Sequence, residues 1–122
     1  MKLLSQLAAV VLLSAALPAA AQINPFRSGR TEAGLSGEDS DLLFSSVNQL
    51  NLRKDVGVGS SESWRNPATG SYGTSSVTQI LDRSGMPCHR LRHEVFARGA
   101  QSPRQYELTW CRTPEGEWKT LG

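Results

Sequence analysis

The sequence predicts an α+β fold, in which an N-terminal amphipathic helix packs on an antiparallel β-meander of four or five strands with one disulfide. Three observations predict it. One stretch, 38–54, repeats its apolar residues with the period of a helix, and the rest divides into short segments separated by turn formers. Two cysteines, Cys88 and Cys111, fall in neighbouring segments. A helix with one apolar stripe cannot bury that stripe alone, so we expect it to lie on the sheet.

The first 21 residues have the pattern of a secretory signal peptide. Lys2 gives a positive start, an apolar run covers 3–17, and small residues up to Ala21 predict cleavage near Ala21-Gln22. The apolar run is too short for a stable membrane span, so we expect no transmembrane span in the mature chain. Because Gln22 rather than a cysteine would follow the cleavage point, we also expect no lipid anchor.

The mature chain has room for one domain, since about a hundred residues is the size of a single small domain. We expect 22–37 to be a flexible linker, because it mixes turn formers with little periodicity, and 38–122 to form the α+β domain. The 13 Lys and Arg residues nearly balance the 11 Asp and Glu residues. This balance argues against nucleic acid as a partner, since nucleic-acid binding needs a one-sided basic field.

The helix is expected to follow a serine cap, with Ser36 and Ser40 as the candidates. Acidic residues occupy its first turn and basic residues its last, which suits the helix dipole. Three apolar residues recur at helical spacing: Leu43, Val47 and Leu50.

Five strand segments follow, each bounded by a turn. They are expected near 62–65, 72–81, 87–98, 102–112 and 117–121. The turns between them, 66–70, 82–85, 99–100 and 114–116, all contain Gly, and the first and last also contain Pro. Pro presets φ and Gly accepts positive φ, so short strands joined in this way indicate an antiparallel meander.

Export would place Cys88 and Cys111 in an oxidising compartment, where a disulfide between them is expected. If they face each other across neighbouring strands, the hairpin closes around Gly99-Ala100, where a turn is already expected. The same register pairs Leu91 with Leu108, His93 with Tyr106, His89 with Trp110, and Arg92 with Glu107. One face then carries apolar and aromatic pairs, and the other carries the bridge and an ion pair. The alternative of a redox-active pair is disfavoured, because catalytic dithiols are usually close in sequence.

Three motifs fall in order along the domain. They are Trp64-Arg65-Asn66-Pro67-x-x-Gly70-x-x-Gly73, Gly85-x-x-Cys88-His89 and Cys111-Arg112-x-x-Glu115-Gly116-x-Trp118. Together they resemble the C-terminal domain of the rickettsial-type 17 kDa outer-membrane surface antigen family, exported proteins of Gram-negative bacteria. The family usually has Arg in place of His89 and Asp in place of Glu115. The resemblance covers about 39–121 and implies a cell-envelope protein of the periplasm or outer membrane with no established reaction.

Five residues form the candidate binding surface: Trp64, Asn66, Arg90, Arg112 and Trp118. Trp64 and Trp118 are either exposed platforms for a glycan or peptide, or part of the core; Trp110 is expected in the core. The arginines near the bridge are expected to form a dispersed, solvated surface paired with Glu94 and Glu107 rather than an anion-binding patch.

No catalytic, metal or cofactor site is expected. His89 and His93 share a strand face, but a metal would need further ligands, so a polar edge beside aromatic rings is the simpler interpretation. The sequence has no nucleophile elbow, nucleotide loop or recognisable carboxylate pair. We therefore expect a non-catalytic structural or protein-interaction module of the cell envelope, with a peptidoglycan- or glycan-binding domain as the alternative.

Overall fold

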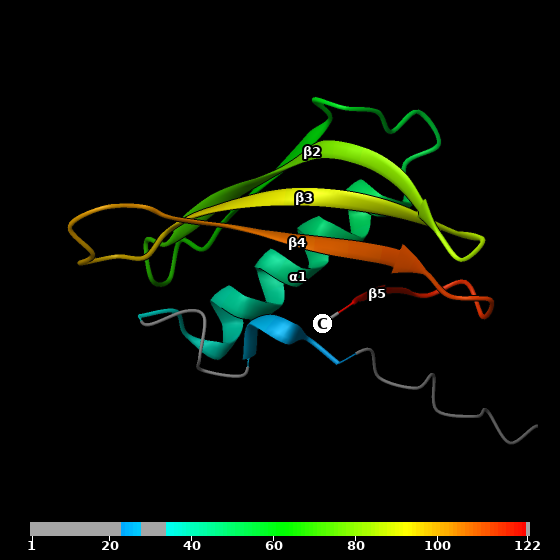
Figure 1. The fold of residues 1–122 in the computed structure, drawn as a ribbon. Coiled ribbons are helices and arrows are strands. Elements are labelled where there is room, and N and C mark those ends of the chain that lie inside the picture. Colours follow the sequence, from blue (N-terminus) through cyan, green and yellow to red (C-terminus); the bar gives the residue numbers. More distant parts are fainter. Residues whose placement is uncertain (1–22, 28–33, 122) are drawn as a thin grey trace, which may run out of the picture.

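One helix lies against a five-stranded antiparallel sheet in the computed structural model, which describes residues 23–27 and 34–121 (Figure 1). The elements in chain order are η1 (Pro25–Arg27), α1 (Gly37–Leu52), β1 (Ser61–Arg65), β2 (Tyr72–Arg83), β3 (Met86–Phe96), β4 (Arg104–Arg112) and β5 (Trp118–Thr120). The strand order β1-β2-β3-β4-β5 is the predicted meander. The expected signal peptide, 1–21, lies outside the described residues. In the described part of the chain, no helix has the length and apolar character to span a membrane.

The helix begins at a capping box. The Ser36 hydroxyl accepts a hydrogen bond from the Asp39 backbone N–H at 3.0 Å, and the Asp39 carboxylate accepts one from the Ser36 N–H at 2.9 Å. Of the two candidate caps, Ser36 is therefore the cap. The helix ends at Leu52, with Arg53 as an extended C-cap, rather than reaching Lys54 as expected.

Asp39 also ties the start of α1 to the turn between β1 and β2. Its Oδ1 accepts hydrogen bonds from Asn66 Nδ2 at 2.7 Å and from Thr69 Oγ1 at 2.6 Å. Burial alone would raise the pKa of Asp39, but the hydrogen bonds from Thr69, Ser36 and Asn66 outweigh it and lower the pKa. The Asn-Pro-x-x-Gly motif is thus a turn fastened to the helix.

The predicted register of β3 and β4 is confirmed. Cys88 faces Cys111, His89 faces Trp110, Leu91 faces Leu108, Arg92 faces Glu107, and His93 faces Tyr106. The disulfide Cys88–Cys111 is formed. The loop that joins these strands covers 97–103, so it is longer than the expected reversal at Gly99-Ala100, although Gly99 takes the expected positive φ of 84°.

The core lies between α1 and the inner face of the sheet, which curves over the helix (Figure 1). Leu43, Val47 and Leu50 on the predicted stripe are all fully buried. They form one cluster with side chains from the sheet and from η1: Phe26, Trp64, Val77, Leu91, Val95, Trp110 and Trp118.

Phe26 corrects the expectation that 22–37 is a flexible linker. Its side chain is 2% exposed and lies among the rings of His93, Tyr106 and Trp110, at centroid distances of 5.3, 6.2 and 6.0 Å. Arg27 forms an ion pair with Asp41 of α1 at 2.5 Å. The linker interpretation is therefore wrong for residues 23–27, because an aromatic side chain in this segment completes the core.

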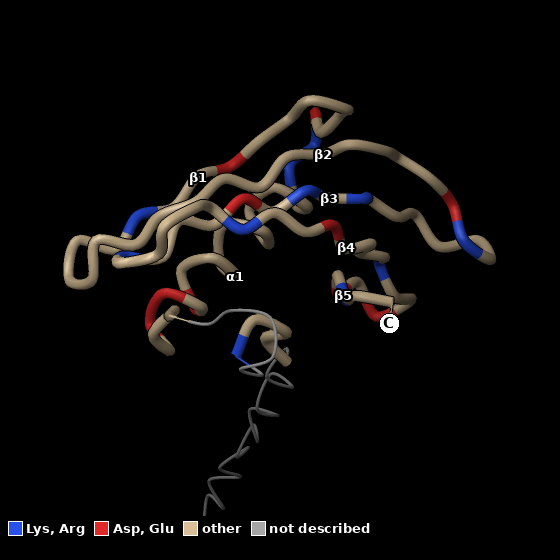
Figure 2. Tube along the Cα trace, turned by 60° about the vertical axis from the view of Figure 1, so that its left-hand side comes forward, with Lys and Arg blue, Asp and Glu red and all other residues tan. Residues whose placement is uncertain are grey.

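The outer face of β3 and β4 carries paired charges. Arg90 contacts Glu107 at 2.6 Å and Arg92 contacts it at 3.4 Å, and these contacts, first the hydrogen bond from Arg90, lower the pKa of Glu107. Glu94 accepts a hydrogen bond from Gln105 at 2.7 Å rather than from an arginine. Positive and negative residues are interspersed over the sheet, as the tube in Figure 2 shows.

Candidate functional site

A groove of about 880 Å³ opens beyond the C-terminal end of α1. Three parts of the chain line it: the end of the helix and the residues after it (51–54 and 56), the β2–β3 hairpin (85–87 and 89), and the end of β4 with the turn into β5 (112–114, 116 and 118). The helix stops at Leu52 while the strands of both hairpins extend past it. The groove is therefore a consequence of unequal element lengths in the fold.

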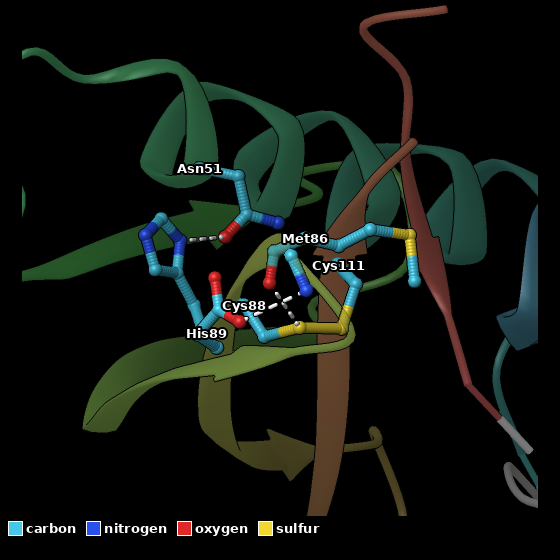
Figure 3. Close-up of a disulfide and its surroundings, with 7 residues drawn as sticks. Asn51, Met86, Cys88, His89 and Cys111 are labelled. Atoms are coloured by element: carbon cyan, nitrogen blue, oxygen red, sulfur yellow. Dashed lines mark hydrogen bonds between the residues drawn. A yellow bond between two sulfur atoms is a disulfide. The ribbon is translucent and has the colours of Figure 1, made fainter. Parts of the chain in front are cut away.

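The floor of the groove is built by three side chains from three elements. The ring of His89 stacks on that of Trp118 at a centroid distance of 4.2 Å and an interplanar angle of 20°. His89 Nδ1 lies 2.9 Å from Asn51 Oδ1, a contact drawn in Figure 3. An amide oxygen only accepts, so in this orientation Nδ1 carries the proton and donates a hydrogen bond to Asn51 Oδ1.

His89 is held as a neutral ring. Burial lowers its pKa, since a charged imidazole loses hydration beneath the helix end. With Nδ1 engaged by Asn51, Nε2 is the acceptor nitrogen and makes no hydrogen bond to another described residue. A lone neutral histidine can bind a ligand donor, but a general base in nucleophilic catalysis also needs a nucleophile within reach.

The groove is positively charged. Its lining includes Arg53, Lys54 and Arg112, and none of the described residues that line it is Asp or Glu. Arg53 is partly neutralised, because it lies 3.8 Å from Glu62 and 4.0 Å from Asp55. Lys54 and Arg112 are exposed and have no ion pair with another described residue. Two free cations thus remain on separate walls.

The disulfide fastens two of these walls together. His89 directly follows Cys88 in β3, and Arg112 directly follows Cys111 in β4. Figure 3 shows the bridge beside Asn51, His89 and Met86. The bridge is buried, with both cysteines no more than 1% exposed. It is therefore a structural constraint on the spacing of the groove walls rather than an accessible redox centre.

The five residues of the predicted binding surface do not share one surface. Trp64, Asn66 and Trp118 are at least 94% buried, so of the two alternatives for Trp64 and Trp118 the structure shows core positions and not exposed platforms. Their rings complete the core because so small a domain has few other large apolar groups. Arg90 lies on the outer face, paired with Glu107. Of the five, Arg112 and Trp118 line the groove.

His93 lies in the core rather than at a site. Its Nδ1 is 2.7 Å from Ser75 Oγ, and its Nε2 accepts a hydrogen bond from Trp110 Nε1 at 3.3 Å. Both His93 and Ser75 are fully buried, so no substrate reaches this pair. Among residues 23–27 and 34–121, no group of three or more His, Cys, Asp or Glu side chains gathers where it could hold a metal.

Sequence reasoning missed two residues of the groove, Asn51 and Lys54. Asn51 lies one position after the apolar stripe, 2% exposed, and Lys54 was interpreted as the last residue of the helix. A signal was present, because a polar residue that continues the buried side of a helix needs a partner. Its partner, His89, lies 38 positions further along the chain, which the helix pattern alone does not reveal.

Two curated relatives are similar to the chain, and both are named 17 kDa surface antigen. One is from Rickettsia bellii (strain RML369-C) and the other from Rickettsia bellii. Each is 29% identical over 91 residues, which make up 74% of this chain and 56% of the relative. The chain therefore spans about half the length of the curated relatives it matches. No family model matches the chain, and no solved structure matches it.

Proposed function

The chain is a distant relative of the 17 kDa surface antigens, and we propose that it is an exported, non-catalytic module of the cell envelope that binds another envelope protein. Its place would be the periplasm or the outer-membrane surface, in keeping with the signal-peptide pattern of 1–21 and the name of its relatives. The observation that carries the proposal is the groove. It combines free cations, exposed apolar side chains and a rigid floor, which are features of a recognition site.

The chemistry of the lining favours recognition over catalysis. His89 is the one histidine among the described lining residues, burial lowers its pKa, and its Nδ1 is held by the Asn51 amide oxygen. A reaction would need a nucleophile or a second acid–base group close to it. The two cysteine sulfurs, those of Cys88 and Cys111, are bonded to each other.

Photo-crosslinking in intact cells tests the proposal. A benzophenone amino acid replaces Leu52, which is 68% exposed at the groove. The matched control replaces Ser45, an exposed residue of α1 that does not line the groove. We expect a protein adduct of one discrete mass from position 52 and none from position 45. Absence of an adduct at position 52, or equal adducts at both positions, would contradict the proposal.

A second candidate, binding to peptidoglycan or another glycan, is favoured by one observation: Trp118 is among the residues that line the groove. Because Trp118 is also a core residue, its replacement would test folding rather than binding. Arg112→Gln is the better variant, since Arg112 is exposed and lies in the same wall. If the protein binds glycan through this groove, Arg112→Gln should be retained less than the parent on purified sacculi. Equal retention of the two would contradict the glycan hypothesis.

A further inference from the structure

We propose that the groove receives an acidic peptide segment of the partner protein, with its carboxylates between Lys54 and Arg112 and an apolar side chain against Leu52 and Pro87. This inference rests on the proposed function and specifies the chemistry of the partner. It commits to a peptide because the groove offers cations and an apolar wall together.

Two of the positive charges at the groove have no ion pair with another described residue. Arg27, Arg53 and Arg90 each lie within 4.0 Å of a carboxylate of the same chain. Lys54 and Arg112, by contrast, have no ion pair or side-chain hydrogen bond to another described residue, although both are exposed. They come from the helix end and from β4, so the groove lies between two cations that the fold itself does not neutralise.

Carboxylates close in sequence to the lining residues are already engaged, and Asp55, which follows Lys54, lies 4.0 Å from Arg53. Glu117 lies 3.3 Å from Lys119. Hydrogen bonds from its own backbone N–H and then from Thr113 hold Glu115 and lower its pKa. Asp82, in the neighbouring hairpin, accepts a hydrogen bond from the Gly85 N–H at 3.0 Å. None of these carboxylates pairs with Lys54 or Arg112, so both side chains are free to bind an acidic ligand.

The groove also has an apolar wall. Leu52 ends the helix with 68% of its side chain exposed, and Pro87 is exposed on the facing hairpin. Both line the groove beside the free cations. Burying a leucine side chain of a partner against such a wall removes apolar surface from water and so favours binding. An inorganic anion would gain none of this.

The floor of the groove contains the side-chain amide of Asn51. Asn51 turns its amide oxygen to His89 and its nitrogen away from it (Figure 3). That nitrogen, Nδ2, is enclosed and has no hydrogen-bond partner among the described residues. Because this nitrogen has less than 1 Å² of accessible surface, it is sealed within the floor, and a ligand in the groove reaches it only if the Asn51 side chain turns.

A sugar fits the groove less well than a peptide does. Stacking of a sugar needs a free aromatic face, but the ring of Trp118 is 6% exposed and lies against His89 at 4.2 Å. The geometry therefore favours the peptide over the glycan as occupant.

Binding is measured by fluorescence anisotropy with the disulfide-bonded secreted protein. The probe is a labelled pentapeptide, Glu-Leu-Asp-Leu-Glu with blocked ends, and its neutral counterpart is Gln-Leu-Asn-Leu-Gln. We expect the neutral peptide to bind at least tenfold more weakly. Lys54→Gln and Arg112→Gln should each raise Kd about three- to fivefold. Arg104→Gln is the matched control, because Arg104 is an exposed, unpaired cation at the opposite end of β4, and it should leave Kd unchanged.

Three results would each overturn the inference. They are equal binding of the acidic and neutral peptides, an equal effect of all three variants, and absence of saturable binding of the acidic peptide up to millimolar concentration. The crosslinking from position 52 is independent of peptide charge. A discrete adduct there together with failure of the acidic peptide would leave the proposed function standing and remove only the acidic-peptide inference.

Discussion

Trp110 donates its indole N–H to Nε2 of His93 across 3.3 Å, in the centre of the core. This bond requires that Nε2 carry a lone pair, so the imidazole is neutral and its proton lies on Nδ1, facing Ser75 Oγ at 2.7 Å. Burial lowers the pKa of His93 to about 3. The core therefore contains a polar link that exists in one protonation state.

We predict from this link that the protein loses stability as the pH falls below about 6.5. An unfolded histidine takes up a proton near pH 6.5, whereas folded His93 does not until about pH 3, so the unfolded state binds the extra proton in between. The free energy of unfolding should fall by about 1.4 kcal/mol per pH unit in this window from His93 alone. Urea midpoints between pH 5 and 7.5 measure it, a range above the ordinary pKa of the paired carboxylates.

His93→Gln is the diagnostic variant, because it removes the titrating group. Its slope between pH 5 and 6.5 should be smaller than that of the parent by about one proton. His89 also has a pKa lowered by burial, so His89→Gln should reduce the slope as well, in the same direction. A parental slope retained in His93→Gln would show that His93 is not the source.

A second prediction concerns Phe26. Phe26→Ala should lower the free energy of unfolding by about 3 kcal/mol or more, because the ring is 2% exposed among aromatic neighbours and its loss leaves a cavity. Ile23→Ala is the control, with Ile23 89% exposed and an expected change near zero. Chemical unfolding followed by tryptophan fluorescence measures both. Equal stability of the two variants would contradict the prediction and would mean that this segment does not stabilise the fold.

The register of β3 and β4 could be predicted from the sequence, whereas the burial of Phe26 could not. The register of β3 and β4 was predictable because the paired cysteines, the Gly99 turn and side-chain alternation all require the same alignment. Phe26 was not predictable, because a single aromatic residue in a turn-rich segment has no period to indicate what it contacts. Its burial depends on where the segment returns to the helix.

A third prediction tests close packing at Gly73 in β2. A Cβ at this position would lie 2.5 Å from the carbonyl oxygen of Glu94 and 2.7 Å from Trp64 Nε1. Gly73→Ala should therefore destabilise the fold by about 2 kcal/mol, since backbone and a core ring must move. Gly57→Ala is the matched control, because a Cβ there meets nothing within 4 Å. Urea midpoints that fall equally in both variants would contradict the prediction.

The groove was less predictable than the fold because its walls come from three separate parts of the chain. Arg112 and Trp118 were singled out in the sequence, but Lys54 gave no sign of lying near them. Their meeting depends on where α1 ends relative to the two hairpins, a tertiary property. The tryptophans were ambiguous for the same reason, since the sequence does not reveal that Trp64 and Trp118 face the helix side of the sheet.

The last prediction joins the bridge to the groove. Replacing both cysteines, Cys88→Ala with Cys111→Ala, opens a loop of sequence separation 23 and should cost about 3 kcal/mol of unfolding free energy in the chain-entropy model. Because His89 and Arg112 each follow one of these cysteines, the amide signals of both residues should shift or broaden in ¹⁵N–¹H spectra at low temperature, where the variant is still folded.

The far end of the same hairpin is the internal control. Val95 and Arg104 pair near the other end of β3 and β4, and their amides should keep the parental shifts. A uniform change along both strands would mean that the bridge stabilises the sheet as a whole. Unchanged signals at His89 and Arg112 would show that strand pairing alone sets the spacing of the groove walls.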